Sequence, residues 1–182
     1  MSSEPRADSP EGKLKRRRVF FGLWPDEATR TTLARATRRA TRAAGGRATR
    51  RENLHITVAF LGGVTAVELD RACAVPPLGT GPVELVLDTL GHWARPRILW
   101  LAPSVRPDAL MALERSLWDG LVAQGFERER KVFTPHMTLC RRARAIEEAV
   151  RPVRWRAERL TLLESVPVER GVRYEPIQDW PL

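Results

Sequence analysis

The stretch Asn53-Leu54-His55-Ile56-Thr57-Val58-Ala59-Phe60-Leu61-Gly62 decides how the rest of the chain is interpreted. Successive side chains of a strand point to opposite faces, so His55 and Thr57 share one face while Ile56 and Val58 point to the other. We therefore expect a strand with a polar, chemically useful side and a side that packs in the core.

The same pattern occurs again in Thr134-Pro135-His136-Met137-Thr138-Leu139. His136 and Thr138 share one face, and Met137 and Leu139 supply the apolar one. Two of the three histidines are thus followed at the second position by threonine, an outcome with a chance probability of roughly 1–2%. A single His-x-Thr most often marks an ordinary half-buried strand, so the context of the pair decides.

The surroundings of the two motifs repeat at an interval of about 80 residues. Each half is expected to run through a strand, a Pro-Asp pair, a helix, a glycine, a loop and then the His-x-Thr strand. A repeat of this length indicates a duplicated lobe. We predict an α+β fold of two pseudo-symmetric lobes of mainly antiparallel sheet, backed by helices, with both histidines in a central groove.

Local patterns predict the individual elements between the motifs. Glycines end the two long helices, Gly45-Gly46 the first and Gly125 the second. The expected helices are Pro25 to about Ala44, Ala66–Ala74, Pro107–Gln124 and a helical turn over Ala145–Val150. The expected strands are Arg18–Leu23, a hairpin over residues 83–101 that turns at Gly91-His92, and Trp155–Val166 paired with Gly171–Ile177.

Length and composition indicate one folded domain, residues 18–182, preceded by a disordered basic tail over residues 1–17. The formal net charge of +9 favours an anionic partner such as nucleic acid or a phosphorylated small molecule. No apolar run is long enough to cross a bilayer, and the two cysteines make no disulfide framework. We expect a cytoplasmic protein with no membrane association and no obligate protein partner.

Two imidazoles that face each other suit acid–base displacement at phosphorus, where one takes a proton from the nucleophile and the other gives one to the leaving oxygen. The hydroxyls of Thr57 and Thr138 can bond non-bridging phosphate oxygens. Arg141 follows the second motif and would hold the remaining charge. Strict alternation puts Arg141 on the wrong face, so it contributes only if the strand ends or bulges there.

Other chemistries have weaker support in the sequence. The chain has neither a phosphate-binding P-loop nor a dinucleotide fingerprint. A zinc site of His55, His136 and Cys140 is conceivable, because His136 and Cys140 would share a face of a regular strand, but the usual zinc-ligand spacings are absent. A Ser or Cys nucleophile beside either histidine stays open, although no nucleophile-elbow sequence is present. We expect no metal and no cofactor.

Several further stretches agree with one known family. They are Val19-Phe20-Phe21-Gly22-Leu23 with Pro25, Arg97-Ile98-Leu99-Trp100-Leu101, Phe133 before the second motif, and Tyr174-Glu175-Pro176. Together with the paired His-x-Thr strands, they make the chain resemble the two-histidine phosphoesterase superfamily. Within it, the chain is similar to the RNA 2',3'-cyclic phosphodiesterase branch, also called LigT or 2'-5' RNA ligase-like. The likeness covers Val19 to Leu182, and Met137 replaces the more usual Ile or Leu.

The resemblance implies metal-independent hydrolysis of an RNA or nucleotide 2',3'-cyclic phosphate to a 2'-phosphate. We expect His136 to act as general base and His55 as general acid, with the two roles open to exchange. The expected phosphate-binding residues are Thr57, Thr138 and Arg141, and weaker candidates for lining the nucleoside side are Phe21 and Phe133. The alternatives are 2'-5' RNA ligation, hydrolysis of another cyclic nucleotide, and a non-catalytic basic RNA-binding module.

Overall fold

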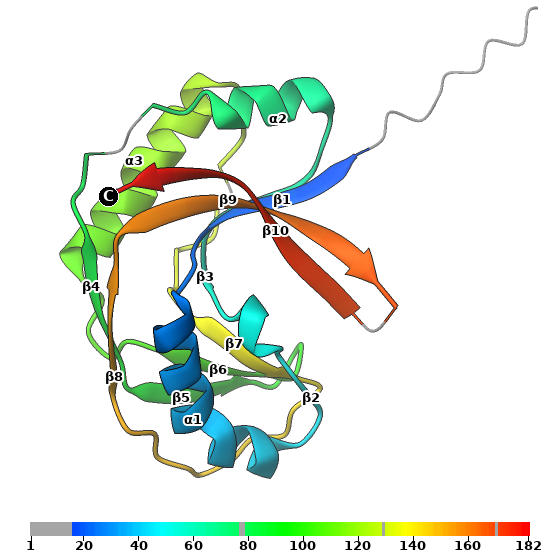
Figure 1. The fold of residues 1–182 in the computed structure, drawn as a ribbon, viewed down its shortest axis with the longest axis vertical. Coiled ribbons are helices and arrows are strands. Elements are labelled where there is room, and N and C mark those ends of the chain that lie inside the picture. The colour runs from blue at the N-terminus through cyan, green and yellow to red at the C-terminus, as the bar shows by residue number, and fades with distance from the viewer. Residues whose placement is uncertain (1–15, 77–78, 129, 170) are drawn as a thin grey trace, which may run out of the picture.

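The computed structural model describes residues 16–76, 79–128, 130–169 and 171–182 (Figure 1). Its helices are α1 (Glu27–Ala44), α2 (Ala66–Cys73) and α3 (Asp108–Ala123), with a short 3-10 helix η1 (Arg51–Asn53). Its strands are β1 (Arg17–Leu23), β2 (Arg47–Ala48), β3 (Ile56–Val64), β4 (Val83–Leu87), β5 (Thr89–Trp93), β6 (Ile98–Ala102), β7 (Met137–Arg141), β8 (Val153–Ala157), β9 (Arg159–Val168) and β10 (Gly171–Pro181).

An antiparallel sheet in the order β10-β9-β1-β3-β7-β6-β5 forms the centre of the molecule, with β2 on the free part of β7. Strands β3 and β7 carry the two histidine motifs and pair only at Ile56 and Met137. The sheet therefore divides at this junction into two halves, β10-β9-β1-β3 and β7-β6-β5. Strands β4 and β8 form a separate two-stranded sheet. This arrangement confirms the predicted α+β fold.

Each long helix packs on one half of the sheet, whereas the strand that precedes the helix in sequence lies in the other half (Figure 1). Helix α1 follows β1 but contacts β7, and α3 follows β6 but contacts β3. The two halves are thus tied together by their helices as well as by the single β3–β7 pair. Both histidine strands are supported from behind by a helix.

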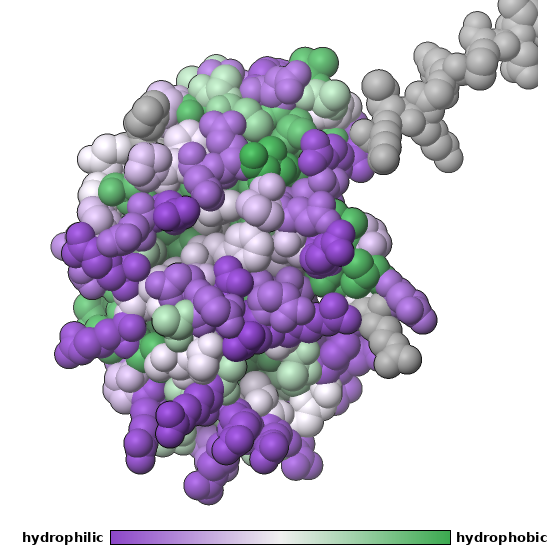
Figure 2. All heavy atoms as spheres, viewed as in Figure 1, coloured by the Kyte–Doolittle hydropathy of each residue, from purple (hydrophilic) through white to green (hydrophobic). Residues whose placement is uncertain are grey.

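Helix α1 has the boundaries that its sequence predicts. The Asp26 side chain accepts a hydrogen bond from the Thr29 amide at 2.7 Å and caps the first turn. Gly45 follows the last turn with a φ of 63°, which glycine adopts without steric cost. The outer side of α1 is strongly hydrophilic (Figure 2), because its exposed side chains include Arg35 and Arg38.

The predicted hairpin over residues 83–101 is wrong. Strand β4 pairs with β8, and the hairpin that does form joins β5 to β6 through residues 94–97. Gly91 lies inside β5, where a Cβ atom would be only 2.0 Å from the Trp100 indole. The glycine interpreted as a turn is therefore there to make room for a large side chain on the neighbouring strand. His92 lies in β5, and its Nε2 is 3.2 Å from the Ala143 carbonyl oxygen.

Three smaller predictions are also corrected. Residues 145–150 form no helical turn; Ile146 and Val150 instead reach the core from an irregular segment. The predicted strand over residues 155–166 is two strands, interrupted at Glu158, because β8 pairs with β4 while β9 pairs with β1. Residues 1–15 of the predicted tail, which extends to residue 17 in the sequence prediction, lie outside the described residues. Arg17, the last residue of that predicted tail, instead begins β1. Among the described residues, no helix has the length and apolar character needed to cross a membrane.

Candidate active site

Each histidine strand contains a β-bulge immediately after its threonine. The pairing register skips Val58 in β3 and Leu139 in β7. In each strand the skipped residue and the next residue are both buried, whereas in a regular strand two consecutive side chains point to opposite faces. Because the bulges reset the alternation, Phe60 and Arg141 return to the face of the threonines. The sequence predicts that Arg141 contributes only if the strand ends or bulges near it, and the bulge in β7 meets this condition.

One cavity of about 870 Å³ collects the predicted site residues from both halves of the sheet. His55, Thr57, His136, Thr138 and Arg141 all line it. The remaining walls come from β1, β2 and the β9–β10 hairpin. Two strands separated by about 80 residues in sequence therefore present their polar faces to one space.

His55 is held from two directions. Its Nδ1 is 2.7 Å from the Asn53 carbonyl oxygen, which only accepts, so Nδ1 carries the proton of the neutral ring. Its Nε2 lies 3.1 Å from the Thr57 hydroxyl. The ring packs against Phe20 at 4.8 Å and, in a T-shaped arrangement, against Tyr174 at 4.9 Å between centroids. These contacts fix the ring so that its Nε2 faces Thr57.

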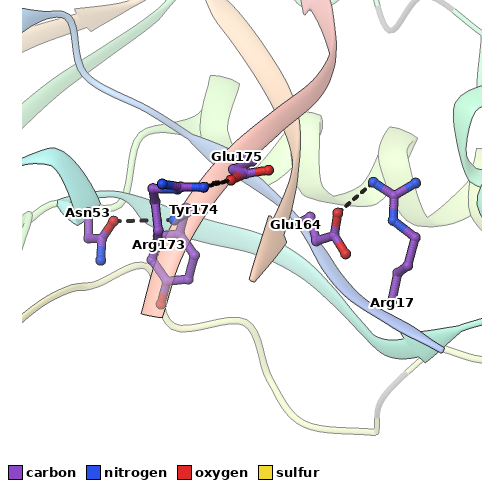
Figure 3. A network of polar contacts seen from close by, with 6 residues as sticks. All are labelled: Arg17, Asn53, Glu164, Arg173, Tyr174 and Glu175. Carbon is purple, nitrogen blue, oxygen red and sulfur yellow. Dashed lines mark hydrogen bonds and ion pairs between the residues drawn. The ribbon is translucent and has the colours of Figure 1, made fainter. Parts of the chain in front are cut away.

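Asn53 connects the His55 loop to β10, and sequence reasoning did not identify it. Its side-chain amide donates to the Val172 carbonyl at 2.8 Å. Its side-chain oxygen accepts from the Tyr174 amide at 3.4 Å (Figure 3). Its own carbonyl holds His55. One buried side chain therefore positions both the imidazole and the strand whose tyrosine packs against it.

His136 has matching but more open surroundings. Its Nδ1 is 2.8 Å from the Thr134 carbonyl oxygen, which again leaves Nε2 as the acceptor of the neutral ring. Trp93 packs against the imidazole at 4.5 Å in an edge-on arrangement. His136 also lines a neighbouring cavity of about 390 Å³, together with Thr57, Trp93 and Phe133. It therefore adjoins two open spaces.

The pKa of each imidazole is lowered, which favours the neutral form of both rings. Burial lowers the pKa of His55 from 6.5 to about 4, opposed by the Asn53 carbonyl and reinforced by the nearby charges of His136 and Arg141. Burial also lowers the pKa of His136, with the Thr134 carbonyl opposing the shift and Arg141 adding to it. An anion in the cavity would reverse these shifts by pairing with the protonated rings.

The two phenylalanine candidates do not line the cavity that holds the histidines. Phe21 is 0% exposed and packs against Trp180 at 5.3 Å between centroids. The phenyl ring on the cavity wall is that of its neighbour Phe20, because alternation along β1 places the two on opposite faces. Phe133 lies in the adjoining cavity beside His136.

The bulge in β7 also removes the geometric basis of the zinc alternative. It turns Cys140 to the buried face, where Sγ donates to the Gly45 carbonyl at 2.7 Å. His136 and Cys140 consequently do not share a face. Across the part of the chain that the structure describes, no three His, Cys, Asp or Glu side chains cluster as metal ligands.

Comparisons with known proteins agree with this geometry. An RNA 2',3'-cyclic phosphodiesterase of Escherichia coli is 32% identical over 145 residues, which are 75% of this chain and 80% of that protein. One of Geobacillus stearothermophilus is 31% identical over 147 residues, 72% of this chain and 46% of that protein. The crystal structure of E. coli LigT complexed with 3'-AMP superimposes with a TM-score of 0.81 at 26% identity, covering 92% of this chain and 98% of that one.

The family model of the 2'-5' RNA ligase superfamily matches residues 25–169, which include both histidine motifs. The match spans β3 and β7, the strands at the junction of the two sheet halves. The family expected from the sequence is thus confirmed: the chain belongs to the 2'-5' RNA ligase superfamily.

Proposed function

We propose that the protein hydrolyses the terminal 2',3'-cyclic phosphate of RNA to a 2'-phosphate. The observation that carries the proposal is the single cavity shared by two His–Thr pairs and Arg141. Two imidazoles supply both proton transfers, and the strained ring and a positioned water leave little for a metal to add. The named activity of the E. coli and Geobacillus relatives supports the same reaction. RNA ends and small cyclic nucleotides are the proposed substrates, met in the cytoplasm.

In the proposed reaction a water oxygen forms a bond to phosphorus as the bond from phosphorus to the ribose O3' breaks. The His136 Nε2 takes the water proton, and the protonated His55 Nε2 gives its proton to O3'. The surroundings support this division of roles. His136 adjoins a second cavity of about 390 Å³, from which the attacking water would come, whereas two aromatic rings pack on His55 and the second space that it lines holds only about 120 Å³.

Substrate binding would supply the proton that His55 lacks in the free protein. A phosphate anion in an enclosed site strengthens charge pairing and raises the pKa of the ring that it contacts. Once Nε2 is protonated it donates rather than accepts, which frees the Thr57 hydroxyl to donate to a phosphate oxygen. Thr138 and Arg141 would bind the other non-bridging oxygens.

The test is incubation of the purified protein with a nucleoside 2',3'-cyclic phosphate in the presence of a chelator. We expect a 2'-phosphate, identified by phosphorus NMR, and a loss of roughly 10³-fold or more in kcat for His55→Ala or His136→Ala with the fold intact. Exclusive formation of the 3'-phosphate, or activity that disappears in chelator and returns with zinc, would contradict the mechanism. RNA binding without turnover would favour the non-catalytic module.

A substrate analogue separates the two histidine roles. When sulfur replaces the bridging O3', the leaving group departs without a proton. We expect this analogue to restore turnover to His55→Ala much more than to His136→Ala. The reverse order would exchange the acid and base assignments.

Ligation of RNA ends is the second candidate, and the cavity beside His136 favours it. With a volume of about 390 Å³ and walls that include Phe60, Trp93 and Phe133, it has room for an acceptor nucleoside in place of water. An RNA 5'-hydroxyl there would attack the same phosphorus and form a 2'-5' linkage. Addition of a 5'-hydroxyl oligonucleotide should then give a ligated product that ribonucleases specific for 3'-5' linkages do not cut.

A further inference from the structure

The catalytic cavity continues well beyond His55, along the N-terminal half of β1. Phe20 packs on His55, and alternation places Arg18 and then Arg16 on the same face of the strand as Phe20. At about 3.3 Å per residue, Arg16 lies about 13 Å from Phe20. A stacked strand rises 3.4 Å per nucleotide, so this length corresponds to roughly two to four nucleotides, depending on stretching.

Both arginines are held in place without a carboxylate partner among the described residues. Arg16 donates to the Gly63 carbonyl at 2.8 Å, and the Arg18 guanidinium lies over the Phe60 ring at 4.8 Å from its centroid. The intervening Arg17 differs, because Glu164 neutralises it at 2.5 Å (Figure 3). Arg16 and Arg18, which both line the cavity, thus retain positive charge and free N–H donors.

The wall formed by the β9–β10 hairpin has a different character. Glu164, which pairs with Arg17, and Ser165 line its start, and Val166, Pro167 and Val172 give the rest of the hairpin an apolar surface. Phe60 adds a 36% exposed ring at the same cavity. A groove that offers both cationic and apolar groups matches a single RNA strand, whose phosphates and bases need these two environments.

We infer that the RNA upstream of the cyclic phosphate lies along β1, with backbone phosphates on Arg18 and Arg16 and bases toward Phe60 and the β9–β10 wall. The inference rests on the proposed function, because it assumes that the cyclic phosphate lies between the histidines. It specifies the substrate class further: an oligoribonucleotide end is preferred to a mononucleotide. Arg16 and Arg18 are then specificity-determining residues rather than catalytic ones.

The experiment compares two substrates, a nucleoside 2',3'-cyclic phosphate and a tetranucleotide with the same end, for wild type and Arg16→Gln/Arg18→Gln. We expect wild type to prefer the tetranucleotide in kcat/KM, and the double variant to lose roughly 10- to 100-fold of that preference. The salt dependence of tetranucleotide binding should become shallower, by about one in the log–log slope for each arginine removed. Arg18→Lys should restore part of the preference, since it keeps the charge but not the planar stacking.

Arg115→Gln is the matched control, because Arg115 is exposed on α3 and lines none of the described cavities. It should leave the substrate preference unchanged. Equal kcat/KM losses on both substrates in the double variant, or an unchanged preference, would overturn the inference. Anisotropy of a labelled tetranucleotide ending in a 2'-phosphate tests the subsite independently of turnover. Weaker binding in the double variant supports the RNA path even if the proposed hydrolysis fails, and unchanged binding refutes it.

Discussion

Acidification should destabilise this protein largely through one imidazole, that of His55. The folded protein holds its pKa near 4, whereas the ring titrates at 6.5 when it is free of the fold. Between these values the unfolded chain binds a proton that the folded protein does not, so stability falls as the pH drops from about 7 toward 4. His55→Asn keeps a side-chain donor near the position of Nδ1 but removes the titration.

The size of the effect follows from the pKa difference. Integrating over the two pKa values gives a loss of roughly 2.5 kcal/mol between about pH 7.5 and pH 4.5 that is specific to His55. Other groups also contribute to the pH dependence: burial lowers the pKa of His136, and hydrogen bonds from Thr29 and Thr65 lower the pKa of the capping carboxylates Asp26 and Glu68. The contributions of the two carboxylates are common to both proteins and cancel when the variant is compared with wild type, whereas that of His136 changes with the substitution because its charge interacts with that of His55.

The assay is urea unfolding at several pH values, followed by tryptophan fluorescence and far-ultraviolet circular dichroism. We expect the free energy of unfolding of wild type to fall by roughly 2.5 kcal/mol more than that of His55→Asn across this range. Parallel pH profiles for the two proteins would show that His55 is not held neutral by burial. That outcome would remove the argument that substrate must supply its proton.

Three further predictions concern the support of the site. Arg141→Gln should lower kcat/KM on a nucleoside cyclic phosphate by roughly 10²- to 10³-fold, with Arg141→Lys partly active, as measured by initial rates. Asn53→Ala should cost roughly 1–3 kcal/mol in urea unfolding, because it leaves the Val172 carbonyl and the Tyr174 amide without their partner. Gly91→Ala should cost about the same, since its Cβ would overlap the Trp100 indole.

Each of these has an outcome that would count against the structural argument. Full activity of Arg141→Gln would mean that the bulge in β7 does not bring the guanidinium to the phosphate. Wild-type stability of Asn53→Ala would show that β10 is held on His55 by packing alone. A neutral Gly91→Ala substitution would mean that Trp100 has another place to go, and then Gly91 is not needed for the sheet.

The sequence by itself determined the features that depend on local periodicity. The two His-x-Thr strands, the helix from Glu27 to Ala44 and the helix from Asp108 to Ala123 follow from side-chain patterns, caps and glycine stops within a few residues. Those strands also carried the family resemblance and the expectation that two histidines share a site. All of this information lies along the chain.

Only the tertiary structure decided which strands pair and where a regular strand breaks. The pairing of β4 with β8, the bulge that carries Arg141 to the cavity, and the placement of Tyr174 on His55 all depend on partners distant in sequence. Alternation distinguishes Phe20 from Phe21 as members of opposite faces, but it does not say which face meets the site. That choice is made by the helices, which pack on one side of the sheet and leave the other facing the cavity.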